Sequence, residues 1–418
     1  MLSAIFAAML SMTPAASVDP VLPKVVAWRR DFHQHPELGA AEVRTAGIVA
    51  AHLRSLGLEV RTGIAATGVA AVIRGGKPGP KIALRADMDA LPVAEETGLP
   101  FASKVRTSYR GQDVGVMHAC GHDAHTAILM GVAELLVAGR EELAGDVLLI
   151  FQPAEEGPPE PGVPFGARLM IDEGLFQDFK PEAVYGLHVW AGLPAGKVAY
   201  RSGPTMAIAD EWVLKISGEQ THGSRPWDGV DPLTVAAQVQ LAMQSIVARQ
   251  VDIVRSPVVL TTGAIRGGVR YNIIPEDVEM TGTLRSFDAN VRSDVVARIE
   301  KTAQHLAAAS GARSTFQIST TAPLTSNSDS ALTERSGSVL RAALSADTVV
   351  EMPLLTVAED FSQYSTVAPT FFFFVGATSP EINPRDAAPN HSPRFLLDEK
   401  ALEVGLKAMH ALAQDRLR

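Results

Sequence analysis

Four short apolar runs, each followed at once by polar or small residues, constrain the fold of this chain more than any other feature. They occupy residues 81–85, 147–151, 183–187 and 371–375. Each run has the length and composition of a buried strand. Helical patterns alternate with these runs, at 41–56, 124–138, 330–345 and 397–416. This alternation predicts an α/β domain built on a central sheet.

Polar side chains follow the predicted strands directly. Asp87 and Asp89 come after the first run, Glu155 and Glu156 after the second, and His188 after the third. In open α/β sheets, ligands bind at the carboxyl ends of the strands. The sequence therefore predicts a functional site at this edge of the sheet.

The stretch from 206 to 321 has a different order of elements. Strands are expected at 211–217, 258–265, 277–285 and 314–320, and helices at 232–248 and 291–309. This βαββαβ order is that of a ferredoxin-like α+β unit. We therefore expect one domain in two parts, 18–205 and 322–418, with an inserted lid or dimerisation domain at 206–321.

The amino terminus has the pattern of a secretory signal peptide. Residues 2–12 are almost wholly apolar, and small residues with one proline follow up to Ser17. This pattern predicts a signal peptide at 1–17 and export to the periplasm or the medium. No Lys or Arg precedes the apolar run, so a retained amino-terminal tail on a cytoplasmic protein is the alternative. The run is too short to span a membrane, which takes about 20 residues.

Charge and cysteine content exclude two classes of protein. The 418 residues carry a net charge of -9, and their Lys and Arg residues are scattered. This balance offers no basic surface for nucleic acid. One cysteine cannot form an internal disulfide framework.

That single cysteine, Cys120, stands in the run His118-Ala119-Cys120-Gly121-His122-Asp123-Ala124-His125. A thiol two positions from a histidine, just before a predicted helix, is typical of part of a metal site. Because cysteine ligates metal as the thiolate, the positive potential at a helix start favours this role.

The adjacent residues Glu155 and Glu156 suit metal-assisted hydrolysis. Neighbouring side chains at a strand end point to opposite sides of the chain. One carboxylate can therefore hold metal while the other faces a water molecule. A bound ion lowers the pKa of water, and the free carboxylate takes the proton and passes it to the leaving group.

Two further histidines complete a donor set. His188 follows a predicted strand, and His391 lies in the run Asn390-His391-Ser392. Together with Cys120, His122 and Glu156 they supply five N, O and S donors, which suit two close divalent ions per subunit. Thiolate and imidazole donors favour zinc and are compatible with manganese, cobalt or nickel.

Several motifs together resemble the M20 family of metallopeptidases. The similarity is greatest to its amidohydrolase branch, which includes hippurate hydrolases, N-acyl-amino-acid deacylases and indole-acetyl-amino-acid hydrolases. The motifs lie at 33–38, 85–92, 117–125, 151–157, 272–275, 282–285 and 390–392. The resemblance covers nearly everything after residue 24. It implies a phosphorylase/hydrolase-like di-metal domain with the inserted domain described above.

The resemblance also assigns roles in the large domain. It implies that Cys120, His122, Glu156, His188 and His391 are the metal ligands, and that Glu155 is the general base. Asp87 and Asp123 are expected to orient ligand histidines, although Asp123 could equally cap a helix. His33, His35, His118 and His125 are expected mostly to be hydrogen-bonded supports.

In the inserted domain the resemblance implies three more site residues. His222 matches a histidine that reaches a neighbouring subunit's site and stabilises the oxyanion. Asn272 and Arg285 match positions associated with the substrate carboxylate or its amide. A homodimer or higher homo-oligomer through the inserted domain is therefore expected.

These residues predict an amidohydrolase that cleaves N-acyl amino acids, with aromatic, hippurate-like or ochratoxin-like amides as the expected substrates. Candidate apolar linings for an aromatic moiety are Phe165, Met206, Trp227 and Tyr271. Two alternatives remain: a di-, amino- or carboxypeptidase of the same family, and a non-catalytic metal-binding scaffold.

Overall fold

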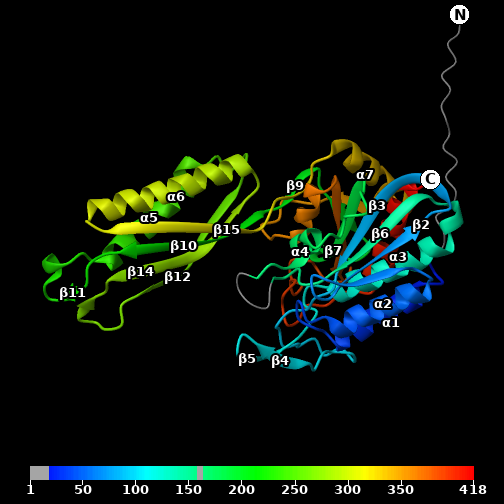
Figure 1. Ribbon diagram of the computed structural model, residues 1–418, viewed down its shortest axis with the longest axis horizontal. Coiled ribbons are helices and arrows are strands. Elements are labelled where there is room, and N and C mark those ends of the chain that lie inside the picture. The colour runs from blue at the N-terminus through cyan, green and yellow to red at the C-terminus, as the bar shows by residue number, and fades with distance from the viewer. Residues whose placement is uncertain (1–17, 158–162) are drawn as a thin grey trace, which may run out of the picture.

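The computed structural model describes residues 18–157 and 163–418. The predicted signal peptide lies outside these residues and stays a prediction. The chain forms a large lobe and a smaller elongated lobe (Figure 1). Within the described ranges, no helix is long and apolar enough to cross a membrane.

The large lobe contains an eight-stranded sheet in the order β1-β2-β6-β3-β7-β18-β8-β17. Its strands are β1 (Val60–Ile64), β2 (Gly68–Arg74), β3 (Lys77–Asp87), β6 (Ala144–Gln152), β7 (Ala183–Pro194), β8 (Val198–Tyr200), β17 (Val349–Glu351) and β18 (Thr370–Thr378). The central strands β6, β3, β7 and β18 run parallel. They contain the four apolar runs, which confirms the predicted α/β fold.

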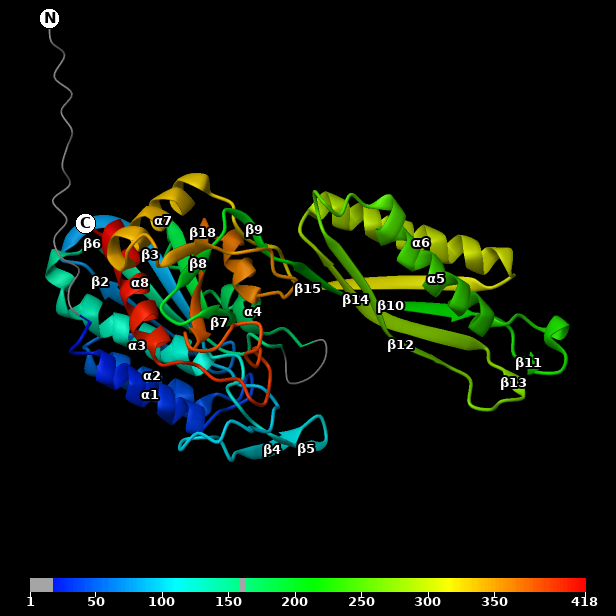
Figure 2. The same ribbon diagram turned by 180° about the vertical axis from the view of Figure 1, so that it is seen from behind.

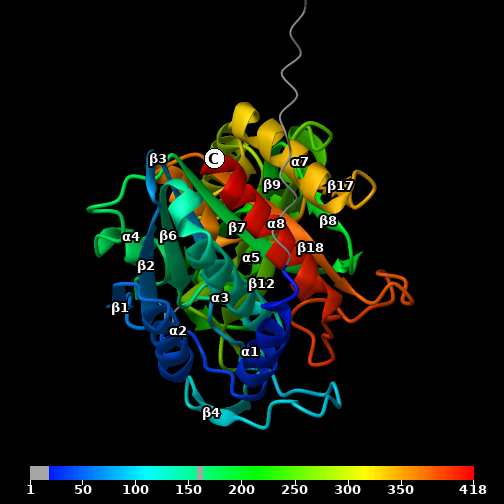
Figure 3. The same ribbon diagram turned by 90° about the vertical axis from the view of Figure 1, so that its right-hand side faces the viewer.

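Helices cover one face of this sheet. They are α1 (Leu22–Gln34), α2 (Val43–Ser55), α3 (His122–Ala138), α7 (Ser330–Leu344) and α8 (Lys400–Arg416). Figure 3 shows α1, α3 and α8 next to one another over the sheet. The other face packs against α4 (Gly166–Asp172) and the short helix η3 (Asp360–Thr366).

The run 371–375 shows why its strand is apolar throughout. Successive strand residues point to opposite faces. Phe371 and Phe373 lie in the core beneath the five helices, whereas Phe372 and Phe374 lie in the core beneath α4 and η3. A strand that is buried on both faces therefore needs an apolar residue at every position.

The small lobe is the predicted α+β unit. Its antiparallel sheet has the order β12-β14-β10-β15. The strands are β10 (Ile208–Ser217), β12 (Val258–Gly267), β14 (Asp277–Ser286) and β15 (Arg313–Ala322). The helices α5 (Pro232–Gln250) and α6 (Ala289–Ala309) cover one face of this sheet (Figure 2). The buried Trp212 belongs to the core between the sheet and the helices. The exact division of the chain at 205 and 321 stays a prediction.

Short elements complete the structure. The strands β9 (Gly203–Met206) and β16 (Thr325–Asn327) pair at the junction of the lobes. The strands β11 (Thr221–His222) and β13 (Ile273–Ile274) pair at the far tip of the small lobe. The remaining elements are β4 (Arg106–Tyr109), β5 (Gln112–Gly115), η1 (Arg140–Glu142) and η2 (Pro226–Asp228).

A buried histidine on α8 gives the large lobe a predictable sensitivity to acid. His410 is buried, and its Nε2 has no hydrogen-bond partner within the described part of the chain. Burial, assisted by Arg418, lowers the pKa of His410 from 6.5 to about 4. The unfolded chain therefore binds this proton more readily, and stability falls as the pH drops from about 6.5 to about 4.

Replacing His410 by leucine should remove this contribution. At pH 4.5, relative to pH 7.5, the wild-type chain should lose about 2.5 kcal/mol of unfolding free energy that the variant keeps. Urea unfolding of both proteins at the two pH values measures the difference. His305→Leu, at an exposed position, is the control and should follow the wild type. An unchanged pH dependence in His410→Leu would contradict the interpretation.

Candidate active site

Five potential metal donors converge at the carboxyl edge of the large sheet. Cys120 directly precedes Gly121 and the start of α3, where His122 is the first helical residue. Glu156 follows β6, His188 lies within β7, and His391 lies in the loop after β18. The parallel strands thus bring together donors that are up to 271 positions apart in the chain.

The cysteine sulfur lies at the centre of this cluster. Cys120 Sγ is 3.3 Å from His188 Nε2 and 3.2 Å from His391 Nε2. His391 Nε2 is also 3.0 Å from Glu156 Oε1. His122 Nε2 lies 3.9 Å from Glu156 Oε1 and 4.0 Å from Glu155 Oε2. These separations are short enough for the donor atoms to share one or two ions.

The donors fall into groups that fit metal. Cys120, His122 and His188 form one group whose ligand atoms lie within 4.8 Å of one another, and Cys120, Glu156 and His391 form a second. His122 Nε2 is buried without a hydrogen-bond partner in the described residues. Because an unpaired buried nitrogen is costly, its position facing the two glutamates indicates a ligand role. The residues present therefore fit a divalent metal centre.

Hydrogen bonds fix the ring orientation of the donor histidines. His122 Nδ1 is 3.2 Å from Asp89 Oδ1, and His188 Nδ1 donates to the carbonyl oxygen of Val189 over 2.6 Å. Both contacts leave Nε2 free to face the cluster. Such outer contacts set the tautomer of a metal-binding histidine.

The loop that carries His391 is held in a strained conformation. His391 has a φ of 72°, a left-handed value that is unfavourable for a residue with a side chain. The preceding Asn390 fixes the loop: its Nδ2 donates to the carbonyl oxygens of Cys120 and Val189, and its Oδ1 accepts from the amide of Ala191. Strain of this kind persists where surrounding contacts hold it in place, often at functional sites.

Gly121 allows the close approach of the Cys120 loop to β7. Its φ is 98°, and a Cβ at this position would lie 2.2 Å from Val189 Cγ2. Any other residue would therefore be strained at this φ and would clash with the side chain of Val189.

Glu155 lies beside the metal donors, and residues of the segment 359–360 contact it from the side away from them. The backbone amide of Asp360 donates to Glu155 Oε1 over 3.4 Å. Glu359 and Asp360 in turn bind the buried guanidinium of Arg85, at 2.9 Å and 3.2 Å. Burial, then the carboxylates of Glu359 and Glu156, raise the pKa of Glu155 well above its usual range. A raised pKa makes the carboxyl group a better proton acceptor, which suits a role in proton transfer.

The electrostatics of the cluster favour bound cations. Burial, then Glu156 and Glu155, raise the pKa of Cys120 well above its usual value. For His122, burial opposes protonation, but Asp87 and Asp89 outweigh it and raise the pKa to about 10. The carboxylates therefore create a field that stabilises positive charge at this site.

Asp87 and Asp123, the two carboxylates expected to orient ligand histidines, make their closest contacts with residues outside the donor set. Asp87 Oδ1 is 2.6 Å from His125 Nδ1 and 3.9 Å from His122 Nδ1. His125 also accepts the backbone amide of Val189 through Nε2, so it supports β7 as expected. Asp123 binds Arg29 and His33, at 2.9 Å and 2.8 Å, and contributes to the packing of α1 on α3.

The three small-lobe residues do not lie together in one chain. His222 is exposed on β11 at the far tip, where the hydroxyl and amide of Ser224 contact its Nδ1 (Figure 1). Asn272 lies next to it, because its carbonyl oxygen accepts the amide of Gly223. Arg285 lies near the end of β14, a strand of 10 residues that extends about 30 Å from the tip toward the junction. Within a single chain, His222 and Asn272 are thus remote from the metal donors.

A cavity of about 470 Å³ opens over the donors. Cys120, Glu155, Glu156, His188 and His391 line its acidic and metal-binding side. Trp190, Met206 and Val357 supply an apolar wall, with Glu359 and Arg385 also at the cavity. Of the candidate apolar linings, Met206 lies here, whereas Trp227 and Tyr271 are exposed on the small lobe.

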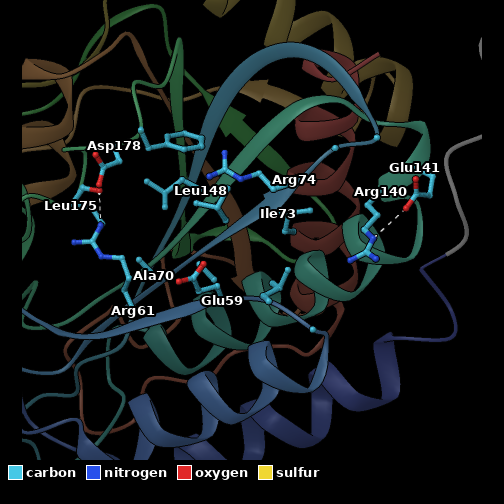
Figure 4. A pocket seen from close by; sticks show the side chains of 17 residues that line it. Glu59, Arg61, Ala70, Ile73, Arg74, Arg140, Glu141, Leu148, Leu175 and Asp178 are labelled. Carbon is cyan, nitrogen blue, oxygen red and sulfur yellow. Dashed lines mark hydrogen bonds and ion pairs between the residues drawn. The ribbon is translucent and has the colours of Figure 1, made fainter.

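A second cavity, of about 550 Å³, lies at the edge of the large sheet beside β1 and β2 (Figure 4). Its arginines have partners within the lobe: Arg61 donates to the carbonyl oxygens of Gly174 and Leu175, and Arg74 pairs with Asp146. None of the five metal donors lines it. The chemistry therefore belongs to the first cavity.

Comparison with known proteins places this arrangement in a family. The profile of peptidase family M20/M25/M40 matches residues 83–415. The chain belongs to the M20 family. Its homologues are named hydrolases of amide bonds, and this M20 protein is an enzyme of the same class.

Three relatives illustrate the range of the family. Thermostable carboxypeptidase 1 of Saccharolobus solfataricus is 40% identical over 390 residues, which cover 93% of this chain and 94% of the relative. N-acetylcysteine deacetylase of Bacillus subtilis is 36% identical over 391 residues, which cover 93% and 96%. The crystal structure of a dinuclear metal-binding M20 peptidase from Bacillus subtilis superposes with a TM-score of 0.80 at 34% identity, covering 96% and 99%. This M20 protein thus shares its fold, including the inserted domain, with solved members of the family.

Some residues at this M20 site escaped the sequence reasoning. In the sequence Asp89 is only a polar residue after a strand, whereas in the structure it is the partner of His122. The amide of Asp360 contacts Glu155, Glu359 pairs with Arg85 and raises the pKa of Glu155, and Asn390 fixes the His391 loop. The run Ala358-Glu359-Asp360-Phe361 was the available signal for the first two. Its contacts to Glu155 arise only when η3 packs against β6 and β7.

Proposed function

We propose that this M20 hydrolase removes the acyl group from N-acyl amino acids, and that aromatic, hippurate-like and ochratoxin-like amides are among its substrates. One observation carries the proposal: a set of cysteine, histidine and carboxylate donors lies beside a second glutamate, Glu155, in one cavity with an apolar wall. The donor set suits metal-assisted hydrolysis, and the wall suits an apolar acyl or side-chain group.

In this proposal Cys120, His122, Glu156, His188 and His391 hold two divalent ions, with Cys120 common to both donor groups. Zinc suits these donors, and manganese, cobalt or nickel are compatible. Bound ions would supply Lewis acidity, lowering the pKa of water and polarising the substrate carbonyl.

Glu155 then acts as the proton carrier. Its carboxylate takes a proton from the attacking water and delivers it to the departing nitrogen, so that the amine leaves as a neutral group. Two features support this role: its position beside the donors and the amide of Asp360, which limits its rotation. Arg85 serves as a charged support for Glu359 and Asp360 behind it.

His222 and Asn272 are proposed to complete the site of a partner subunit. Both residues lie on the tip of the small lobe, away from the metal donors of their own chain. A homodimer through the small lobe would allow His222 to stabilise the oxyanion and Asn272 to contact the substrate amide. Arg285, near the junction, is proposed to contact the substrate carboxylate or its amide from its own chain.

A carboxypeptidase activity is the second candidate, because a relative with 40% identity is named a thermostable carboxypeptidase. A substrate panel separates the two. The metal-loaded enzyme should cleave N-benzoylglycine and N-acetyl amino acids with higher kcat/KM than it cleaves dipeptides that carry a free amine. Incubation with a chelator should remove the activity, and added zinc or manganese should restore it. Preference for free-amine peptides, or activity that resists chelation, would overturn the proposal.

A further inference from the structure

One cation at the catalytic cavity has no role in the chemistry above. Arg385 lies in the loop between β18 and α8, six positions before His391. The same loop therefore carries a proposed metal ligand and a guanidinium to one cavity.

A tight turn fixes the backbone at this arginine. The amide of Arg385 donates to Asn383 Oδ1 over 3.1 Å, and the amide of Asp386 donates to the carbonyl oxygen of Asn383 over 2.8 Å. Pro384 occupies the second position of the turn, where its fixed φ is favourable. The turn holds Arg385 at the cavity without using its side chain.

The charge distribution around the cavity is uneven. Glu155, Glu156 and Glu359 line it. Arg385 is the one arginine or lysine among the described lining residues. It is exposed, and its guanidinium takes part in no ion pair within the described chain. By contrast, Arg85 behind the cavity is fully occupied by Asp87, Glu359 and Asp360.

The substrate of the proposed reaction carries a negative charge on its α-carboxylate. The uneven charges around the cavity favour one position for that carboxylate. When the scissile amide lies beside Glu155, the cavity of about 470 Å³ has room for the α-carboxylate of an N-acyl amino acid as well. This carboxylate is repelled by the glutamates and attracted by a free guanidinium, which binds carboxylates through paired hydrogen bonds. Trp190, Met206 and Val357 remain for the apolar part of the substrate.

We propose that Arg385 binds the α-carboxylate of the substrate and makes the enzyme selective for N-acyl amino acids over their uncharged amides. The inference rests on the proposed function and adds a specificity-determining residue to it. Arg285 is the competing anchor. It lies on the small lobe, and its guanidinium contacts the backbone carbonyls of Asp210 and Leu284 at 3.4 Å.

The test compares N-benzoylglycine with N-benzoylglycinamide, whose carboxylate is replaced by a neutral amide. Benzoate release is measured for the metal-loaded wild type, Arg385→Gln, Arg385→Lys, Arg285→Gln and Arg394→Gln. Arg394 is an exposed arginine of the same loop and is the matched control. Arg385→Gln should lower kcat/KM for the acid about 10- to 100-fold, mainly through KM, and leave the amide within about twofold. Arg385→Lys should recover part of the loss, and Arg394→Gln should behave as the wild type.

Three results would overturn the inference. Equal losses on both substrates would indicate a structural role. An unchanged preference in Arg385→Gln would exclude contact with the carboxylate. Loss of the preference in Arg285→Gln alone would place the anchor on the small lobe.

The proposed function fails separately, if the wild type cleaves neither substrate nor any other N-acyl amino acid. In that case the role of Arg385 is tested by measuring ligand binding in place of catalysis. Calorimetry with N-benzoylglycine should give a dissociation constant at least tenfold weaker for Arg385→Gln than for the wild type. Equal constants would reject the carboxylate contact.

Discussion

Replacing Glu155 by glutamine is expected to lower kcat for N-acyl amino acids by about 10² to 10⁴ while the metal content stays at the wild-type level. Glutamine has nearly the shape of glutamate and can keep the contact with the amide of Asp360. It cannot accept a proton from water or return one to the leaving nitrogen. Steady-state kinetics on the best substrate of the panel, with elemental analysis of the same preparation, measures both quantities.

Cys120→Ala provides the opposite pattern and is the matched control. Cys120 Sγ contacts two of the other donors, so its loss should lower the bound metal and the activity together. Near-normal activity in Glu155→Gln would contradict the proton-transfer role. Loss of metal in Glu155→Gln would instead make this residue a ligand.

The second large effect concerns His222. His222→Ala should lower kcat/KM by about 10² to 10³, the usual cost of losing one oxyanion donor. The residue is exposed at the tip of the small lobe, and among the described residues its imidazole hydrogen-bonds only to Ser224. A loss of folding stability is therefore not expected, and thermal unfolding should match the wild type.

Mixing the two inactive variants tests whether His222 acts on a partner subunit. In a hybrid dimer, the His222→Ala subunit keeps Glu155, and the Glu155→Gln subunit keeps His222. If the histidine acts across the dimer, the hybrid regains one working site, and a mixture refolded together approaches a quarter of wild-type activity at a statistical distribution of subunits. The two variants assayed without exchange are the control. No recovery in a mixture shown to contain hybrids would place His222 at the site of its own chain, or outside catalysis.

The sequence was sufficient to predict the fold because the strands and helices of each lobe have recognisable patterns of apolar residues. The run 371–375 is apolar at every position since both faces of β18 are covered. The order of strands and helices in 206–321 likewise predicts the small lobe without any knowledge of its packing. Helix α1 lies outside the predicted helices, and the junction strands β9 and β16, of four and three residues, are too short to leave a local pattern.

The sequence was sufficient to predict the metal donors of the site. It was less informative about the residues that hydrogen-bond to these donors. Cys120, His122 and Glu156 each adjoin a predicted strand or helix, so parallel topology alone brings them together. The partner of His122 depends on side-chain orientation: Asp87 and Asp89 are two residues apart, and only the folded strand end shows that Asp89 faces His122 while Asp87 faces His125. The separation of Asn272 from Arg285 depends on the length and direction of β14, which a motif comparison does not contain.

The small lobe is inserted through two adjacent strands. β10, which begins the lobe, and β15, which ends it, pair antiparallel from Ala209 with Ala322 to Ser217 with Arg313. The chain therefore leaves and rejoins the large lobe about one strand spacing apart, close to 5 Å. A module attached in this way can be exchanged, shortened or deleted with little change to the sheet that carries the metal donors. Substrate range can therefore change within this inserted module while the sheet that carries the metal donors stays the same.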